Sequence, residues 1–295
     1  MTYITKEAIN KGWSSDKKYC VTDKNGTKYL LRVSDASQYD SKKSEFEMMK
    51  RVAALGVPMC EPLEFGTDDE GVYSVQSWID GEDAEAIIPK CSDAEQYAYG
   101  LESGRILKKI HSLPAPDPIE DWESRFNRKM DKKIAKYREC PIKYDNGQAF
   151  IDYINENRHL LKNRPQTYQH GDYHIGNMMV DREGKLYVID FNRNDYGDPW
   201  EEFNRIVWCA QSSPAFASGM VDGYFDGEVP AEFWRLLALY ISSNTLSSVY
   251  WAIPFGQEEI DTMLNQAADV LSWYDGMRNP VPTWYRLACV ERAHQ

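Results

Sequence analysis

The residues most able to do chemistry lie together between positions 169 and 191. Asp172 stands in the segment HGDYHIGN, and Asn177 ends that segment five positions later. Two short apolar runs then surround a polar turn, and the second run ends at Asp190. This pattern predicts a β-hairpin. Its antiparallel strands would bring Asn177 and Asp190 to the same end, with Asp172 on the loop that leads there.

These three side chains have the oxygen atoms that phosphoryl transfer needs. Carboxylate and amide oxygens are hard ligands, and Mg²⁺ binds through a few of them together with phosphates and water. A further carboxylate can orient a hydroxyl group and accept its proton, while positioning and charge stabilisation do most of the catalysis. The spacing from Asp172 to Asn177 also equals the Asp-to-Asn spacing of the protein-kinase catalytic loop.

The first 80 residues read as strands with one helix. Two β-rich runs, 18–21 and 28–33, surround Asn25-Gly26, which is a hairpin signal. Helical spacing of apolar residues over 41–55 predicts a helix that stops at Gly56. A loop is expected between Pro58 and Pro62, and a further strand at 72–75.

Beyond residue 81 the pattern is mainly helical, and five helices are expected. They cover residues 93–113, 121–138, 147–161, 233–250 and 257–277. A strand-rich first part joined to a larger helical part predicts an α+β protein with two lobes. The expected division is an N-terminal lobe of residues 1–80 and a C-terminal lobe of residues 81–295.

Composition narrows the class of protein. Apolar residues make up 42% and charged residues 27%, as in soluble globular proteins. The net charge of −12 disfavours nucleic acid as a partner and is compatible with a cationic substrate. No apolar run is long enough to span a bilayer, so no membrane association is expected. The six cysteines are scattered without a CxxC pair, which favours a cytoplasmic location over a disulfide framework.

The central motif resembles that of the aminoglycoside phosphotransferase family, which contains small-molecule kinases with a protein-kinase-like fold. The resemblance rests on the segment 170–177, on Ile189-Asp190-Phe191 and on Gly197-Asp198-Pro199. It implies that Asp172 is the catalytic base and that Asn177 and Asp190 bind Mg²⁺. It also implies an N-terminal antiparallel sheet with one helix, a larger helical lobe, and a nucleotide between the two.

The same resemblance places residues for ATP, or for GTP. Ser14 lies where the family has its nucleotide-positioning loop, and Ser77 to Ile79 would form the adenine-binding connection. Arg32 stands at the position of the usual phosphate-binding lysine, and Glu45 at that of the glutamate that pairs with it. Arginine is always charged and can bind phosphate through two donors, so the role can survive the change.

The acceptor is expected to be a small molecule that bears amine or sugar groups, such as an aminoglycoside. A macrolide or a choline-like metabolite is the alternative within this chemistry. A nucleotide-binding pseudokinase that acts through partners is the alternative from another class, and Arg32 is its main support. A protein kinase is disfavoured because Gly197-Asp198-Pro199 follows Asp190 without a long activation loop. His170 is expected to be structural, and the oligomeric state is left open.

Overall fold

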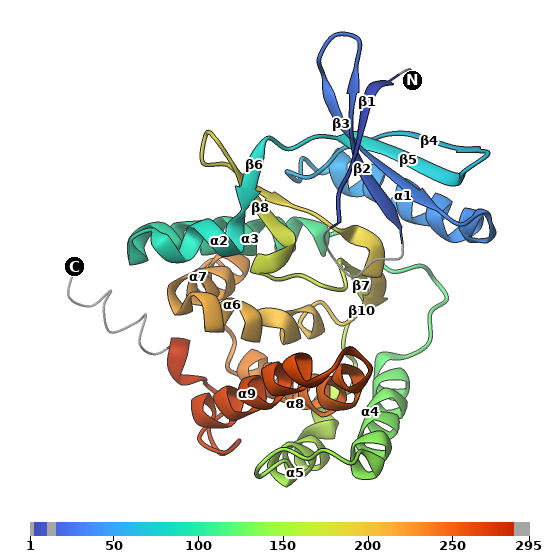
Figure 1. The fold of residues 1–295 in the computed structure, drawn as a ribbon. Coiled ribbons are helices and arrows are strands. Elements are labelled where there is room, and N and C mark those ends of the chain that lie inside the picture. The colour runs from blue at the N-terminus through green and yellow to red at the C-terminus, as the bar shows by residue number, and fades with distance from the viewer. Residues whose placement is uncertain (1–2, 11–15, 286–295) are drawn as a thin grey trace. The chain divides into compact units, whose positions relative to one another are not determined.

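The structure, a computed structural model, describes residues 3–10 and 16–285, and its contacts divide the chain into two compact units (Figure 1). Unit 1 holds the chain up to Ile87 together with Gly176–Asn194. Unit 2 holds Ile88–Ile175 and the chain from Asp195 onward. This differs from the expected division at residue 80. The reason is that the predicted 178–189 hairpin pairs with residues of the first unit.

Unit 1 is built on a five-stranded antiparallel sheet in the order β1-β2-β3-β5-β4. The strands are β1 (Tyr3–Ala8), β2 (Lys17–Asp23), β3 (Lys28–Ser34), β4 (Pro62–Asp68) and β5 (Gly71–Ser77). The predicted hairpin at Asn25-Gly26 joins β2 to β3. Its turn is fixed by the Asp23 carboxylate, which accepts hydrogen bonds from the Asn25 and Thr27 amides at 2.8 and 2.9 Å.

The predicted helix over 41–55 is confirmed as α1 (Tyr39–Ala54), and Gly56 follows it with φ +70°. Its apolar face contacts β4, where the Phe46 ring lies 5.4 Å from the Phe65 ring. Strand β4 begins at Pro62, at the end of the stretch where a loop was expected. Proline lacks an amide donor and is tolerated at the first residue of an edge strand, which is its place here.

A smaller sheet completes unit 1 and explains why residues 176–194 belong to it. Strands β6 (Gly81–Asp83), β8 (Met178–Asp181) and β9 (Leu186–Val188) lie in the order β6-β8-β9, and α2 (Ala84–Ile87) contacts β8. The Val188 amide also donates to the Pro58 carbonyl at 2.9 Å. The hairpin predicted around Gly184 is therefore present as β8 and β9.

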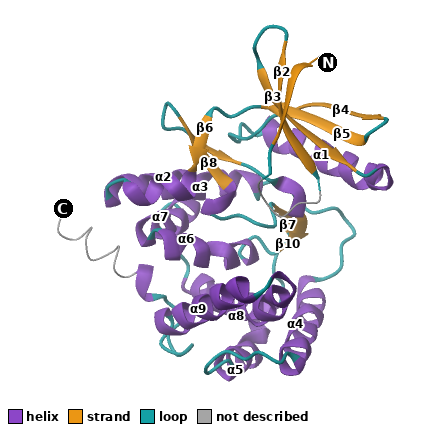
Figure 2. Cartoon of the chain, viewed as in Figure 1, coloured by secondary structure: helices purple, strands orange, loops and turns teal. Residues whose placement is uncertain are grey.

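Unit 2 is mainly helical, as expected (Figure 2). The expected helices correspond to α3 (Asp93–Ile110), α4 (Trp122–Glu139), α5 (Gln148–Asn157), α8 (Ala231–Ala252) and α9 (Gln257–Trp273). It also contains β7 (Thr167–Gln169), which pairs with β10 (Asp195–Gly197), and two further helices, α6 (Ile206–Ser212) and α7 (Pro214–Phe225). Helix α3 begins with a capping box in which Ser92 and Glu95 bond each other's backbone amides.

Helix α7 was not expected from the sequence, because its glycine, serine and proline content is poor for a helix. Its partner α3 explains that content. A Cβ at Gly100 of α3 would lie 2.2 Å from the Phe216 carbonyl oxygen, and one at Gly219 of α7 would lie 2.3 Å from the Tyr97 carbonyl oxygen. The two helices therefore cross with their backbones in close contact, and tertiary packing overrides the weak propensity.

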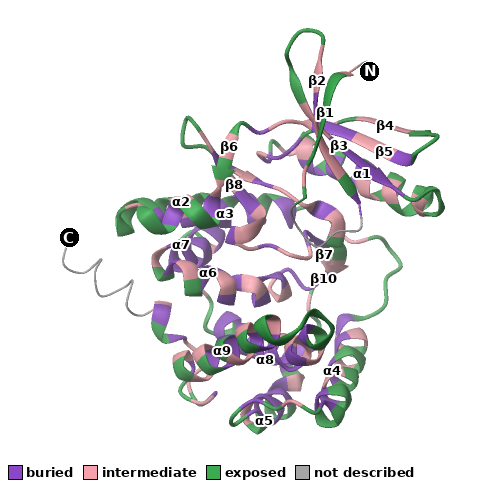
Figure 3. Cartoon of the chain, viewed as in Figure 1, coloured by how far each residue is buried: buried purple, intermediate pink, exposed green. Residues whose placement is uncertain are grey.

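Helix α8 forms the centre of unit 2. Fourteen of its 22 residues are buried, so it is covered on nearly all sides. Figure 3 shows, by contrast, much exposed surface on α4 and α5. None of the helices in the described part of the chain combines the length and apolar character that a membrane span requires.

Candidate active site

Buried contacts within unit 2 hold the loop that carries Asp172 in place. The Gly171 amide donates to the Glu202 carboxylate at 2.8 Å, and the Tyr173 hydroxyl donates to the Ser103 carbonyl at 2.8 Å. Gly171 has φ +86°, a conformation that favours glycine. The Asp172 amide donates to Nδ1 of His170, which is fully buried. His170 therefore has the structural place expected of it.

The Asp172 side chain itself stays accessible to solvent. It is 19% exposed, and its Oδ1 atom lies 3.1 Å from Nε of Arg205 and 3.8 Å from Nε2 of His174. The Arg205 guanidinium lies against the carboxylate and limits its rotation. The carboxylate is thus held in place and reachable from solvent, two properties that a general base needs. The sequence did not indicate Arg205, because it lies 33 positions further along the chain.

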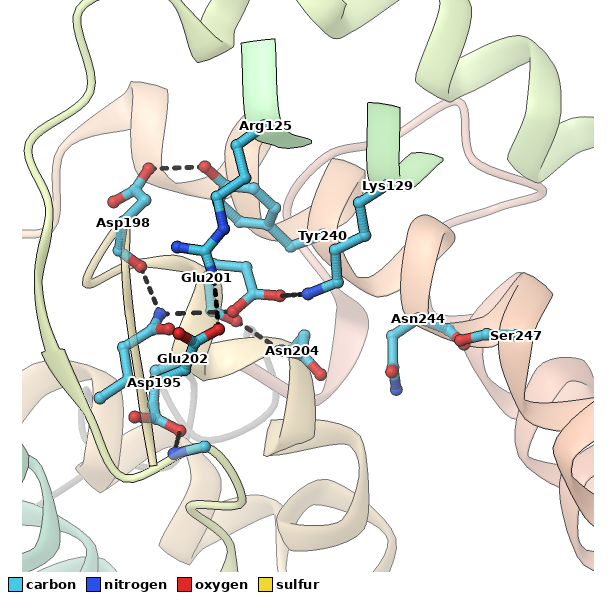
Figure 4. Close-up of polar contacts among 12 residues, drawn as sticks. Arg125, Lys129, Asp195, Asp198, Glu201, Glu202, Asn204, Tyr240, Asn244 and Ser247 are labelled. Atoms are coloured by element: carbon cyan, nitrogen blue, oxygen red, sulfur yellow. Dashed lines mark hydrogen bonds and ion pairs between the residues drawn. The ribbon is translucent and has the colours of Figure 1, made fainter. Parts of the chain in front are cut away.

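The Gly197-Asp198-Pro199 turn anchors the same region (Figure 4). Asp198 is completely buried and accepts hydrogen bonds from Nε of Arg164 at 2.6 Å and from the Tyr240 hydroxyl at 2.5 Å. Its backbone carbonyl accepts a bond from the Gln169 side chain at 2.8 Å. Burial, and then the Asp198 charge, raises the pKa of Tyr240 well above its ordinary value, so Tyr240 remains a donor.

Glu202 lies behind the loop that carries Asp172, next to the amide of Gly171. It is 2% exposed, and its second carboxylate oxygen lies 3.6 Å from Nε2 of His111. Nδ1 of His111 is 3.0 Å from the Tyr224 hydroxyl. Glu202 thus connects the loop to the buried polar side chains of His111 and Tyr224. This gives Glu202 a positioning function, which explains why an acidic residue stands at this place.

Asn177 and Asp190 lie together in unit 1, as the hairpin predicted. The Ile189 amide donates to the Asn177 carbonyl at 3.0 Å, so the residue just before Asp190 is paired with Asn177. Asp190 has φ 67° and ψ 62°, a left-handed conformation that is uncommon for a non-glycine residue. Such strain is often kept at functional positions. One amide and one carboxylate oxygen donor fit Mg²⁺, and these two residues would hold it.

Arg32 is paired differently from the expectation. Its Nη1 lies 3.0 Å from the Asp190 carboxylate, and its Nη2 lies 3.1 Å from the Asp16 carboxylate. Glu45 is instead bonded by Lys42 at 3.2 Å, and Lys42 also reaches Asp16 at 2.8 Å. Among the described residues, therefore, no hydrogen bond joins Arg32 to Glu45. Asp16 forms the hydrogen-bonded ion pair with Arg32, and Glu45 also acts on it by its charge. Burial alone would lower the pKa of Arg32, but the charges of Asp190, Glu45 and Asp16 outweigh this and raise it.

Asp16 is charged despite its burial. Burial alone would raise its pKa, but the hydrogen bond from Lys42 and the charge of Arg32 outweigh this, and the pKa of Asp16 lies below its ordinary value. The sequence offered no signal for this role of Asp16. Ser14, two positions earlier, lies outside the described residues.

Lys18 is a second cation that the sequence reading missed. In the register of β2 and β3 it stands directly opposite Arg32, so both side chains lie on the same face of the sheet. It is half-buried, and burial lowers its pKa while the nearby Asp190 opposes that change. The hairpin centred on Asn25 could have revealed it, because Lys18 and Arg32 are both seven positions from that centre.

Ser77 is the last residue of β5, and Ile79 follows it two positions later. The Ser77 hydroxyl accepts a hydrogen bond from the Glu61 amide at 2.8 Å, and the Ser77 amide donates to the Glu61 carbonyl at 2.9 Å. Ile79 is 7% exposed. The segment is therefore held by Glu61, the residue before β4, and ends at a buried isoleucine.

Comparisons with known proteins decide the family. A sequence model described as the phosphotransferase enzyme family, APH, matches residues 5–234 of the chain. The chain belongs to this family. It is therefore a phosphotransferase of a family whose members phosphorylate hydroxyl groups. The aminoglycoside 3'-phosphotransferase of Niallia circulans is 23% identical over 210 residues, which cover 69% of this chain and 78% of that protein.

Solved structures show the fold. An aminoglycoside 2'-phosphotransferase-IIIa in complex with GDP superposes with a TM-score of 0.65 at 15% identity, covering 92% of this chain and 93% of that one. A gentamicin complex of APH(2'')-IIa gives 0.60 at 18% identity, covering 90% and 91%. A thermostable mutant of APH(4)-Ia, in a ternary complex with ADP and hygromycin B, gives 0.63 at 15% identity, covering 92% and 94%. The expected kinase-like α+β fold is thus confirmed.

Proposed function

We propose that this phosphotransferase moves the γ-phosphoryl group of ATP or GTP to a hydroxyl group of a small amine- or sugar-bearing molecule, with Asp172 as the base. The observation that carries the proposal is the position of Asp172. Its loop is fixed by buried bonds to Glu202 and Ser103, while the side chain itself stays reachable beside Arg205.

In the proposed reaction, the acceptor hydroxyl donates a hydrogen bond to Asp172 and gives up its proton as its oxygen attacks the γ-phosphorus. The bond between the γ-phosphorus and the bridging oxygen breaks, and the nucleoside diphosphate leaves. Arg205 keeps the carboxylate oriented through its 3.1 Å contact. Asn177 and Asp190 would hold Mg²⁺, whose charge would offset the charge of the phosphates.

Arg32 and Lys18 support binding of the nucleotide phosphates. They occupy opposed positions on neighbouring strands, and both lie near Asp190. Because Arg32 is already bonded to two carboxylates, Lys18 supplies the second positive charge for a triphosphate. Glu45 and Lys42 hold Asp16 and hence Arg32 in place. Ser77 to Ile79 would contact the purine, and Ser14 would contact the phosphates.

The test is release of nucleoside diphosphate with Mg²⁺ across aminoglycosides, macrolides, amino alcohols and sugars, in the wild-type protein and in Asp172→Ala. We expect release to be stimulated by one acceptor class and lost in the variant. Mass spectrometry of the acceptor should show the added phosphoryl group. Stimulated release that persists in Asp172→Ala would contradict the proposal, as would an absence of Mg²⁺-dependent nucleotide binding.

A further inference from the structure

Helix α4 presents a row of three cations toward the segment that follows Asp195. Arg125, Lys129 and Lys133 are spaced four residues apart, so they lie on one face of the helix. The first two have acidic partners. Arg125 bonds the Asp195 carboxylate, and Lys129 lies 3.1 Å from the Glu201 carboxylate (Figure 4).

The third cation, Lys133, lies one turn further along and lacks such a partner. Within residues 3–10 and 16–285, no hydrogen bond or ion pair joins it to another side chain, although it is half-buried. The charged groups around it are Lys129, Glu201 and Arg205. Glu201 is already bonded by Lys129 at 3.1 Å, and Gln169 donates to its other oxygen at 3.3 Å. Lys133 is therefore the surplus positive charge of the group.

Arg205 connects the surplus charge on Lys133 to the proposed base, Asp172. Arg205 is close enough to Lys133 for its charge to lower the pKa of that lysine. Its Nε atom contacts Oδ1 of Asp172 at 3.1 Å. Arg205 and Glu201 also belong to the same short 3₁₀ turn, Glu201–Arg205. Lys129 and Lys133 thus lie near Glu201, and Arg205, at the other end of the same turn, contacts Asp172. An acceptor held against Asp172 would meet a positive region rather than an acidic one.

A half-buried ammonium group without a counterion is unfavourable, and proteins resolve this by a pKa change or by binding an anion. Burial, followed by the charge of Lys129, lowers the pKa of Lys133 to about 7. An anionic ligand would restore the full charge of Lys133 on binding. Charged hydrogen bonds to a buried partner give both affinity and discrimination.

We infer that the acceptor of the proposed reaction carries an anionic group, a carboxylate or a phosphate, which Lys133 binds beside Arg205. The inference rests on the proposed function and makes its acceptor more specific. Hydroxy amino acids, sugar acids and sugar phosphates have this chemistry, and amine or sugar groups are compatible with it. A polycation without an acidic group lacks the partner that Lys133 requires.

The experiment compares acceptors in matched pairs that differ only in the anionic group. A hexose is paired with its uronic acid and with its 6-phosphate, and a hydroxy amino acid is paired with its amide. Both kcat/KM for nucleoside diphosphate release and the Kd by calorimetry are measured. We expect the anionic member of a pair to be preferred roughly tenfold or more. The uronic acid and the phosphate separate the two sources of negative charge.

Variants of Lys133 connect the preference to this side chain. Lys133→Met should remove the preference through KM rather than kcat, and Lys133→Arg should restore most of it. Lys132→Met is the matched control, because Lys132 is the exposed neighbour on the same helix and should leave the preference unchanged. The affinity for anionic acceptors should also weaken as the pH rises above about 7, because Lys133 then loses its proton.

The calorimetry keeps the two proposals separate. If no compound stimulates release but the anionic members still bind better to the wild type than to Lys133→Met, the phosphotransfer proposal fails and the anion site stands. A preference for neutral or cationic members, an equal affinity within every pair, or a preference that survives Lys133→Met would overturn the anion site.

Discussion

Asp198 and Asp172 of unit 2 are each paired with an arginine, and they differ in what surrounds them. Asp198 is completely buried, and Arg164 bonds it through two nitrogens at 2.6 and 3.0 Å. The Tyr240 hydroxyl and the Trp200 amide add two more donors, at 2.5 and 3.0 Å. Asp172 is 19% exposed and meets its arginine through a single nitrogen, Nε of Arg205, at 3.1 Å.

The difference separates a carboxylate that stabilises the fold, Asp198, from one that a ligand can reach, Asp172. A carboxylate has room for about four hydrogen bonds, and Asp198 uses that capacity entirely within the fold. It can offer nothing to a ligand, but its loss would leave buried donors without partners. Asp172 has part of its surface open, so a hydroxyl group can reach it. Similar motif residues in a sequence can thus have opposite functions, and burial tells them apart.

The largest expected effect on this comparison is the loss of stability in Asp198→Asn. The amide cannot accept all four donors, and the half-buried Arg164 would lose its buried counterion, so we expect a loss of about 3 kcal/mol or more. The measurement is Tm by circular dichroism. Asp195→Asn is the control on the same segment, because its side chain is 56% exposed and should change Tm little. An unchanged Tm in Asp198→Asn would show that Asp198 does not stabilise the fold.

Arg205→Met should show the opposite profile, with activity lost and stability kept. The Asp172 carboxylate would lose the group that orients it, and we expect kcat to fall by roughly tenfold or more. Arg205→Lys should recover part of the loss, since it keeps the charge without the planar geometry. Steady-state kinetics, nucleotide Kd and Tm are read together. A variant with wild-type kcat would show that Arg205 has no positioning effect on Asp172.

Lys18→Met extends the comparison to unit 1, where the paired carboxylate is Asp190. We expect Kd for the Mg²⁺-nucleotide complex to rise about tenfold, because one charged contact to phosphate is lost. Lys17→Met is the matched control. Lys17 is exposed, and as the next residue of the strand it points to the other face of the sheet. Equal nucleotide affinity in Lys18→Met and Lys17→Met would contradict the assignment.

Glu202→Gln should have the smallest effect of the four. The glutamine oxygen can still accept the Gly171 amide, and only the charge opposite His111 is lost. We expect a loss of about 1 kcal/mol, which corresponds to a Tm lower by about 2–4 °C in a chain of this size. A collapse of kcat with an unchanged Tm would instead place Glu202 among the reacting groups.

Local patterns predicted much of the fold, including the hairpin that brings Asn177 and Asp190 together. The Asn25-Gly26 turn, the helix that stops just before Gly56 and the hairpin that joins Asn177 to Asp190 depend on nearby residues only, and all are present. Helix α7 was missed because its glycines serve close packing against α3, which is a tertiary requirement. Strand β4 was missed because its first residue is a proline, which reads as a loop.

The charge pairs of the site were beyond sequence reasoning. Arg205 lies 33 positions from Asp172, and Asp16 competes with Glu45 for Arg32 through contacts that only the folded sheet creates. The surplus charge on Lys133 is likewise invisible in the sequence, where it is one lysine of a helix rich in lysine. Its significance comes from the partners that Lys129 and Arg205 already have.

We expect Asp172 to act on the reaction and not on the fold, and the decisive variant is Asp172→Asn. The substitution keeps the size of the side chain and removes its capacity as a base. With the best acceptor of the panel, kcat should fall by at least about a hundredfold, while Tm and the nucleotide Kd stay at their wild-type values. A variant that keeps kcat within a few-fold of the wild type would show that Asp172 is not the base. A variant that loses activity only together with its Tm would show that Asp172 acts on the fold.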